Sequence, residues 1–310
     1  MQSQTRITIA ICTFNRAAYL KDTLDDLALQ SVPYDQFEIL VVNNNSKDGT
    51  ETVCDIFRST NPNVQFRTVK ETNQGLSYAR NRAAKEAESQ VLIYIDDDVK
   101  LPENYIETAL DYIERRLSTL CAGGRIHVSF DEEENPDWIP KELMPMFGLH
   151  DLGSENRIYP ISNFPRGGNM MIRKTVFDAF GYFDTTLGRT GKELLGSEEK
   201  AFFERIRKNG VELHYWGELE LTHRIGYKRL EKEYLEKQSE GIGKSERLRL
   251  EGQPAELAKK LGSELLKFLW SLVLSAGYYL SGNSKAAKFI LQFRIWVLKG
   301  FLSGQKKSVF

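Results

Sequence analysis

Short apolar runs alternate with helical patterns over the first hundred residues. Four runs rich in β-branched and aromatic residues predict buried strands, at Ile7 to Phe14, Phe37 to Val42, Val64 to Val69 and Val91 to Ile95. Between the first two runs, and again after the second, apolar residues recur at the spacing of a helix. A repeated order of strand, helix and strand predicts a mostly parallel sheet flanked by helices, so the fold class expected is α/β.

The pattern changes after residue 123, where it becomes irregular. Residues 131–165 carry five prolines among several aromatic residues, which predicts a loop-rich excursion. Regular structure returns with a predicted strand and a predicted helix, at Asn169 to Ile172 and Ser197 to Asn209. Beyond His223 the chain is expected to be mostly helical. We therefore expect an α/β domain over residues 1–225 and a C-terminal helical extension over residues 226–310.

Composition excludes function classes more than it identifies one. The 42 Lys and Arg residues nearly balance the 43 Asp and Glu residues, so the formal charge of −1 gives no support to nucleic-acid binding. Three cysteines without CxxC spacing support neither a disulfide framework nor a zinc site, and they favour a reducing compartment. The first apolar run is too short for a secretory signal. We expect a cytoplasmic protein.

The charge is distributed unevenly along the chain. From Lys259 to Phe310 there are nine basic residues and one acidic residue, a local charge of +8. Between Lys285 and Lys299, basic residues gather on one side of a helical projection, while Phe289 and Trp296 lie elsewhere on it. Two interpretations remain open. This helix lies on an anionic membrane surface, at the inner face of the membrane, or it packs on the body of the protein or in a homo-oligomer.

Polar residues follow the predicted strands at the end where parallel sheets bind their ligands. The sharpest group is Asp96-Asp97-Asp98, directly after the fourth apolar run. Adjacent carboxylates repel one another, and a divalent cation relieves that repulsion. Oxygen ligands suit Mg²⁺ or Mn²⁺. An isolated acidic turn in solvent would explain the same residues, but their position at the end of a central strand favours the metal site.

Four further features, taken singly, fit ordinary structure. The loop from Asn43 to Thr50 has the composition of a turn, and the segment from Asn73 to Asn81 that of a capped helix start. Glu198 and Glu199 stand at a predicted helix start, where the helix dipole favours acidic residues. A single histidine such as His223 is more often structural than functional.

In their order along the chain, these segments resemble the family 2 inverting glycosyltransferases of GT-A fold. The resemblance covers about residues 6–225 and rests on seven short motifs. They are Thr13-Phe14-Asn15-Arg16, Ser46-Lys47-Asp48-Gly49-Thr50, Asn73 to Asn81 with Gly75, Ser77, Ala79 and Arg80, Asp96-x-Asp98, Gly168-Asn169, Gly181-Tyr182-Phe183-Asp184, and Glu198-Glu199 with Arg205 and Gly210. The resemblance implies a Rossmann-like sheet and transfer of a sugar from a nucleotide-sugar donor to an acceptor hydroxyl, in polysaccharide or glycoconjugate synthesis.

The resemblance also implies roles for individual residues. Glu199 is the expected catalytic base, with Glu198 second, and Asp98 and His223 are expected to hold Mn²⁺ or Mg²⁺. Contacts to the nucleotide sugar are expected from Thr13, Asn15, Arg16, Asn43, Asn44, Asn45, Asn73, Gly75, Arg80, Asp96 and Asp97. The donor and acceptor pocket is expected to include Gly168, Asn169, Arg189 and Lys192. The implied donor is a UDP-, GDP- or dTDP-sugar, and the implied acceptor is a glycan or a lipid-linked molecule.

Two departures from the family pattern affect these expectations. Asn43 and Asn44 stand where the family commonly has Asp, in a loop that reads the nucleobase in relatives. An amide offers a donor as well as an acceptor, so the usual assignment of uridine stays open. Glu199 stands where the acidic pair commonly has Asp, and its extra methylene group shifts the base.

Other function classes explain less of the sequence. A Rossmann dehydrogenase requires a GxGxxG motif after the first strand, and the sequence has none there. A haloacid-dehalogenase-like phosphatase has its Asp-x-Asp motif after the first strand, whereas Asp96-x-Asp98 follows the fourth. A decayed, glycan-binding or scaffold protein on the same fold remains an alternative, because of Asn43, Asn44 and Glu199.

Overall fold

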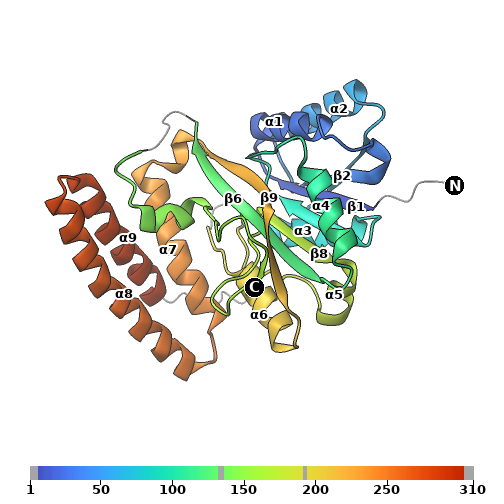
Figure 1. Cartoon of the computed structure of the whole chain (residues 1–310). Coiled ribbons are helices and arrows are strands. Elements are labelled where there is room, and N and C mark those ends of the chain that lie inside the picture. Colours follow the sequence, from blue (N-terminus) through green and yellow to red (C-terminus); the bar gives the residue numbers. More distant parts are fainter. Residues whose placement is uncertain (1–5, 132–135, 191–193, 304–310) are drawn as a thin grey trace. The chain divides into compact units, whose positions relative to one another are not determined.

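The computed structural model describes residues 6–131, 136–190 and 194–303, which form two compact units (Figure 1). The first unit consists of residues 1–129, 148–185 and 198–224. The second consists of residues 130–147, 186–197 and 225–310. The last change of unit therefore falls between Arg224 and Ile225.

One sheet runs through the described part of the first unit, in the order β3-β2-β1-β4-β8-β6-β9-β5, with β7 paired to β9. The strands are β1 (Ile7–Thr13), β2 (Phe37–Asn43), β3 (Gln65–Lys70), β4 (Val91–Ile95), β5 (Val99–Lys100), β6 (Cys121–Phe130), β7 (Arg157–Ile158), β8 (Asn169–Arg173) and β9 (Leu213–Ile225). Strands β3, β2, β1 and β4 are parallel, as predicted, while β8 runs antiparallel to β4 and to β6. The fold is therefore α/β, with a parallel half built from βαβ units.

The strand order places a switch point at β1. Strand β2 lies on one side of β1 and β4 on the other, so the connections after these strands diverge. Ligands of open α/β sheets bind beyond the carboxyl ends of strands at such a point. The loops that leave β1, β2 and β4 there carry Thr13 to Arg16, Asn43 to Thr50 and Asp96 to Asp98. The topology therefore brings three of the predicted motifs to one edge of the sheet.

The structure differs from the sequence prediction after residue 120. Strand β6 occupies Cys121–Phe130, where an irregular segment was expected from Gly123 onward. Gly123 and Gly124 hide the strand pattern, yet close packing requires them. A β-carbon on Gly124 would collide with the carbonyl oxygen of Leu219 on β9, and one on Gly123 would lie 2.5 Å from the hydroxyl of Tyr159.

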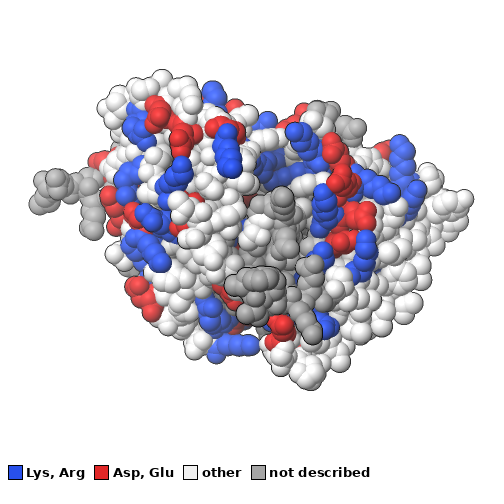
Figure 2. Space-filling view, turned by 180° about the vertical axis from the view of Figure 1, so that it is seen from behind, with Lys and Arg blue, Asp and Glu red and all other residues white. Residues whose placement is uncertain are grey.

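The second unit is mostly helical in its C-terminal part, as predicted. Its helices are α7 (Lys232–Arg249), α8 (Pro254–Leu280) and α9 (Ser284–Leu302). Phe289 and Trp296 of α9 are buried, and the ring of Phe289 contacts that of Trp138. The interpretation that placed the apolar side of α9 in a membrane is therefore wrong, because this side packs inside the unit. Figure 2 shows a broad uncharged surface on its right, the side on which α8 and α9 lie.

No helix within the described residues combines the length and the hydropathy that crossing a membrane requires.

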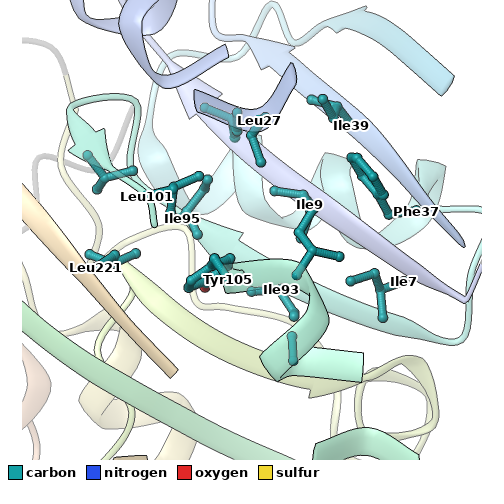
Figure 3. Close-up of a cluster of buried hydrophobic side chains, with 14 of the residues drawn as sticks. Ile7, Ile9, Leu27, Phe37, Ile39, Ile93, Ile95, Leu101, Tyr105 and Leu221 are labelled. Carbon is teal, nitrogen blue, oxygen red and sulfur yellow. The ribbon is translucent and has the colours of Figure 1, made fainter. Parts of the chain in front are cut away.

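The buried apolar side chains of the first unit form two clusters, because successive strand residues point to opposite faces of the sheet. Helices α1 (Ala17–Ala28), α2 (Thr50–Thr60) and α4 (Tyr105–Arg115) contribute to one cluster. Helices α3 (Leu76–Glu86), α5 (Lys174–Phe180) and α6 (Glu198–Lys208) contribute to the other. Figure 3 shows Ile9 and Ile93 of the sheet in the first cluster, with Leu27 of α1 and Tyr105 of α4. Each fully buried side chain of this size contributes about 1.5–3 kcal/mol, so the strand ends rest on a rigid base.

Candidate functional site

Asp96, Asp98 and His223 form a group suited to a divalent cation. The two aspartates follow β4, and the pairing of β5 with β9 sets Val99 opposite His223, beside Asp98. One ligand atom from each of the three residues lies within 4.8 Å of the other two. Asp98 is only 1% exposed, and Asp96 is half-buried. Two carboxylate oxygens and one imidazole nitrogen are a donor set that Mn²⁺ and related ions accept.

Asp97 has a different environment from its two neighbours. Its carboxylate accepts a hydrogen bond of 2.6 Å from the hydroxyl of Thr13, and Thr23 donates to its backbone carbonyl. Burial raises the pKa of Asp97 to about 7, although the nearby guanidinium of Arg16 opposes this shift. Asp97 and Thr13 therefore link the ends of β4 and β1, while Asp96 and Asp98 form the cation-type group.

The guanidinium of Arg16 lies against the aspartates. Its Nη2 is 2.7 Å from Oδ2 of Asp98, and its Nε is 3.5 Å from Oδ1 of Asp97. The Nε2 atom of His223 lies 3.2 Å from the same oxygen of Asp98. The guanidinium of Arg16 thus balances part of the carboxylate charge, and a bound metal ion would compete with Arg16 for Asp98.

A second acidic group is held by Arg80 of α3. Its Nη1 lies 2.8 Å from Oε1 of Glu198, and its Nη2 lies 2.9 Å from Oε1 of Glu199. Burial alone would lower the pKa of Arg80, but the carboxylates of Glu199 and Glu198 raise it, so the guanidinium stays charged. The side chain of Glu198 is 4% exposed, whereas that of Glu199 is 21% exposed. Glu199 is therefore the more accessible acid of the pair.

Two consecutive glycines bring the acidic groups together. A β-carbon on Gly168 would lie 2.8 Å from Oδ2 of Asp96, and one on Gly167 would collide with Arg80 and Glu199. Consecutive α-carbons are only about 3.8 Å apart. Both groups therefore border one site, and a side chain at either glycine would intrude on it. The sequence prediction included Gly168 but missed Gly167, although a Gly-Gly pair just before a strand often marks a close approach.

Asn44 holds the segment that precedes α3. Its Nδ2 donates to the backbone carbonyls of Glu71 and Asn73, at 3.1 and 2.7 Å, and its Oδ1 accepts from the N–H of Gly75 at 2.8 Å. An aspartate would lack the two donated hydrogen bonds and would place a charge against two carbonyl oxygens. The departure from the family pattern at Asn44 therefore has a structural reason.

The other asparagines near β1 and β2 order the adjoining loops. The side-chain oxygen of Asn15 accepts from the N–H of Lys47 at 2.7 Å, and that of Asn43 accepts from the N–H of Ser46 at 2.9 Å. Asn15 and Asn45 adopt positive φ angles of 54° and 65°. Among residues other than glycine, asparagine tolerates such angles best. These side chains thus fix the backbone of the loops at the predicted nucleotide site.

The remaining predicted residues are placed less favourably for ligand contact. Asn169 is fully buried, donates to the carbonyls of Arg125 and Leu219, and accepts from the hydroxyl of Tyr105 at 2.7 Å. It therefore supports the sheet beneath the site. Arg189 is exposed and belongs to the second unit, and Lys192 lies outside the described residues.

Comparisons with known proteins identify the family. The family model described as glycosyl transferase family 2 matches residues 8–181. A glucosyl-dolichyl phosphate glucuronosyltransferase of Haloferax volcanii is 24% identical over 246 residues, which cover 78% of this chain and 77% of that protein. Glycosyltransferase GlyA of Streptococcus pneumoniae is 28% identical over 148 residues, covering 48% of this chain but only 19% of its own length.

The fold is also found among solved structures. A mannosyltransferase of Pyrobaculum calidifontis, solved with GDP-Man and Mn²⁺, superposes with a TM-score of 0.62 at 15% identity, covering 97% of this chain and 88% of that one. This likeness shows a shared GT-A fold. Since the family model matches more than half of the sequence, and includes the segments that carry Arg16, Arg80 and Asp98, the chain belongs to glycosyl transferase family 2.

Proposed function

We propose that this glycosyltransferase moves a sugar from a nucleotide-sugar donor to an acceptor hydroxyl in a metal-dependent, inverting reaction. The observation that carries the proposal is the pair of acidic groups on either side of Gly167 and Gly168. One group, around Asp98, suits a cation, and the other presents Glu199 on a fixed arginine. The transfer requires both groups, because the leaving diphosphate needs positive charge and the attacking hydroxyl needs a group that accepts its proton.

The residues at the end of β4 fit a divalent cation. Asp96, Asp98 and His223 would hold it, and the glycine at position 168 keeps the space beside Asp96 open. When bound, the ion would supply positive charge to the diphosphate of the donor. Arg16, already 2.7 Å from Asp98, would add a second positive charge at the same edge of the sheet.

Glu199 is the proposed base. Its Oε1 is fixed 2.9 Å from Nη2 of Arg80, and its side chain is partly exposed to the site. A carboxylate in this position would accept the proton of the acceptor hydroxyl as that oxygen attacks the anomeric carbon. With one direct displacement and no intermediate bound to the enzyme, the configuration of the anomeric carbon inverts. Glu198 would then serve to position Arg80.

The compared proteins support the classes of donor and acceptor. The mannosyltransferase is solved with GDP-Man and Mn²⁺, and the Haloferax volcanii relative is named for a dolichyl phosphate substrate. We accordingly propose a UDP-, GDP- or dTDP-sugar as donor and a glycan or lipid-linked molecule as acceptor. The cation is Mn²⁺ or Mg²⁺.

Release of nucleoside diphosphate tests this function without a known acceptor. The full chain is incubated with UDP-, GDP- and dTDP-sugars, with Mn²⁺ or with a chelator. We expect slow, Mn²⁺-dependent hydrolysis of at least one donor, and we expect the Glu199→Gln variant to lose it. If no donor is turned over, the chain is a binding or scaffold protein. Release of inorganic phosphate from simple phosphomonoesters would instead indicate a phosphatase.

A further inference from the structure

Helix α8 presents large apolar side chains to solvent along its second half. Leu266, Trp270 and Leu280 are 69%, 60% and 86% exposed, and Leu265, Leu269 and Val273 are exposed as well. At about 100° per residue, the exposed positions from 265 to 280, apart from Lys267, cover about half of the helix circumference and extend for about 22 Å. This arc, the outer face of α8, carries no charged residue, and Lys267 lies beside it with its side chain 44% exposed. Apolar surface of this extent marks an interaction site.

The opposite side of α8 already has its packing partner. Ser275 donates to the carbonyl of Ala287 on α9 at 2.9 Å, and Arg294 of α9 donates to Ser271 at 3.3 Å. Ser271 is 2% exposed. The hairpin of α8 and α9 is therefore held by the inner side of α8, and none of the residues that the structure describes covers its outer face.

Basic residues outnumber acidic residues along α8 and α9. Between residues 257 and 303 the sequence has seven basic residues and a single acidic one, Glu264. Glu264 is buried and pairs with Lys260 at 3.2 Å and with Lys267 at 2.8 Å, so its charge is neutralised inside the hairpin. Near the two ends of the apolar face, by contrast, Lys259 and Lys285 are exposed. The partner must therefore accept apolar side chains and carry negative charge.

We infer that the outer face of α8 lies in the interfacial region of a membrane that contains anionic lipid. The leucines would enter the boundary of the acyl chains, while the lysines remain among the headgroups. Trp270 and Tyr279, both exposed on this face, are residue types enriched at the headgroup level. A second copy of the chain would bring like-charged lysines together in a symmetric contact, so charge complementarity favours lipid. This inference goes beyond the transfer reaction.

Vesicle co-sedimentation of the full chain tests the inference. We expect binding to vesicles of phosphatidylcholine with phosphatidylglycerol and much weaker binding to phosphatidylcholine alone. Binding should decrease between about 0.01 M and about 1 M salt, as the Debye length falls from about 30 Å to about 3 Å. The double variant Leu269→Gln with Trp270→Gln should bind about tenfold more weakly or worse, since both side chains would enter the membrane.

Two controls separate this effect from a general loss of apolar surface or charge. Ile161→Gln removes a side chain that is 90% exposed in the first unit, and it should leave vesicle binding unchanged. Lys285→Glu with Lys288→Glu should abolish the preference for anionic lipid, whereas Lys208→Glu at the exposed end of α6 should not. The inference would be overturned if Ile161→Gln weakened vesicle binding as much as Leu269→Gln with Trp270→Gln does. It would also be overturned if Lys208→Glu changed the preference for anionic lipid as much as Lys285→Glu with Lys288→Glu does.

Trp270 also supplies a spectroscopic readout, because the other tryptophans are less exposed. Anionic vesicles should shift the emission of the full chain to shorter wavelength, and Trp270→Phe should lose this shift while still sedimenting. Absence of binding to anionic vesicles at low salt contradicts the inference. So does a dimer in sedimentation velocity that Leu269→Gln with Trp270→Gln dissociates, because the face would then be an interface between two copies.

Discussion

Glu198 and Glu199 share one arginine but differ in their access to the site. Glu199→Gln removes the proposed base and keeps the side-chain shape, so we expect the rate of transfer to fall by about 10² or more with little change in donor affinity. Glu198→Gln removes a buried partner of Arg80, so we expect mainly a loss of about 1–3 kcal/mol in the free energy of unfolding. Single-turnover kinetics and denaturant unfolding measure the two effects.

The two variants act as controls for each other. If Glu198→Gln alone reduced the rate while Glu199→Gln chiefly reduced stability, the proposed order of the two acids would be reversed. Equal losses of rate without any loss of stability would contradict the separation of a positioning role from a chemical one.

His150 gives the first unit a predictable dependence on pH. Burial, with a smaller effect of Arg166, lowers the pKa of His150 from 6.5 to about 4, and its Nε2 lies 2.8 Å from the hydroxyl of Tyr159. The unfolded chain binds this proton at higher pH than the folded chain does. Above about pH 6.5, therefore, His150 causes no loss in the free energy of unfolding. This free energy falls as the pH drops toward 4, by up to about 3 kcal/mol from this group.

The variant His150→Gln should therefore lose less stability than the wild type between pH 6.5 and pH 4. Chemical denaturation at several pH values measures this difference. His127→Gln is the matched control, since the side chain of His127 is 38% exposed on the same sheet. If the free energy of unfolding fell equally with pH in His150→Gln and in the wild type, His150 would not be the cause of the effect.

At the scale of elements, Gly124 of β6 and Gly262 of α8 have opposite expected effects on stability. Gly124→Ala on β6 would force a β-carbon against the carbonyl of Leu219, so we expect a loss of at least about 1–3 kcal/mol in the free energy of unfolding. Gly262→Ala in α8 meets nothing within 4 Å, so the better helix propensity of alanine should add about 0.5–1 kcal/mol. Thermal and denaturant unfolding of both variants test the signs, and a stabilising Gly124→Ala would contradict the close packing of β6 on β9.

The regular elements of the first hundred residues could be predicted because their apolar periods are local. The predicted strand Val91 to Ile95 is β4 without change, the first two predicted strands differ from β1 and β2 by one residue at one end, and the third is shifted by one residue relative to β3. Strand β6 could not be predicted in the same way, because Gly123 and Gly124 are required by close contacts with residues that are distant in the sequence. Strand β9 did carry a local signal, since Leu219, Leu221 and Ile225 alternate with polar residues.

The sequence predicted which residue types form the candidate site, but not which of the neighbouring side chains face it and which hold the surrounding structure. The sequence pointed to Asp96, Asp98 and His223, which the structure brings together. It could not show that Asp97 turns toward Thr13, or that the side chain of Asn169 is fully engaged beneath the sheet. Such differences between neighbouring side chains depend on the direction of each residue in a folded loop.

At the scale of the whole molecule, the sequence predicted a basic helical extension but left open whether the helix from Lys285 to Lys299 lies on a membrane or packs on the protein. In a helical projection, the aromatic side of α9 and the apolar arc of α8 are equally good candidates for exposure. Burial of Phe293 and Trp296 resolves the choice, because packing among α7, α8 and α9 leaves the arc of α8 outside. Only the three-dimensional neighbours of an amphipathic helix determine which of its faces is covered.

The central claim is that the donor nucleotide binds with a divalent cation at the group around Asp98. Calorimetric titration with UDP, GDP and dTDP, with and without Mn²⁺, tests it most directly on the full chain, the Asp98→Asn variant and the exposed control Asp55→Asn. We predict that at least one nucleotide binds the wild type and Asp55→Asn only with Mn²⁺. The Asp98→Asn variant should still unfold cooperatively but should bind this nucleotide at least about tenfold more weakly, a loss of about 1.4 kcal/mol in the free energy of binding. Binding of equal strength without Mn²⁺, or in Asp98→Asn, would contradict the claim.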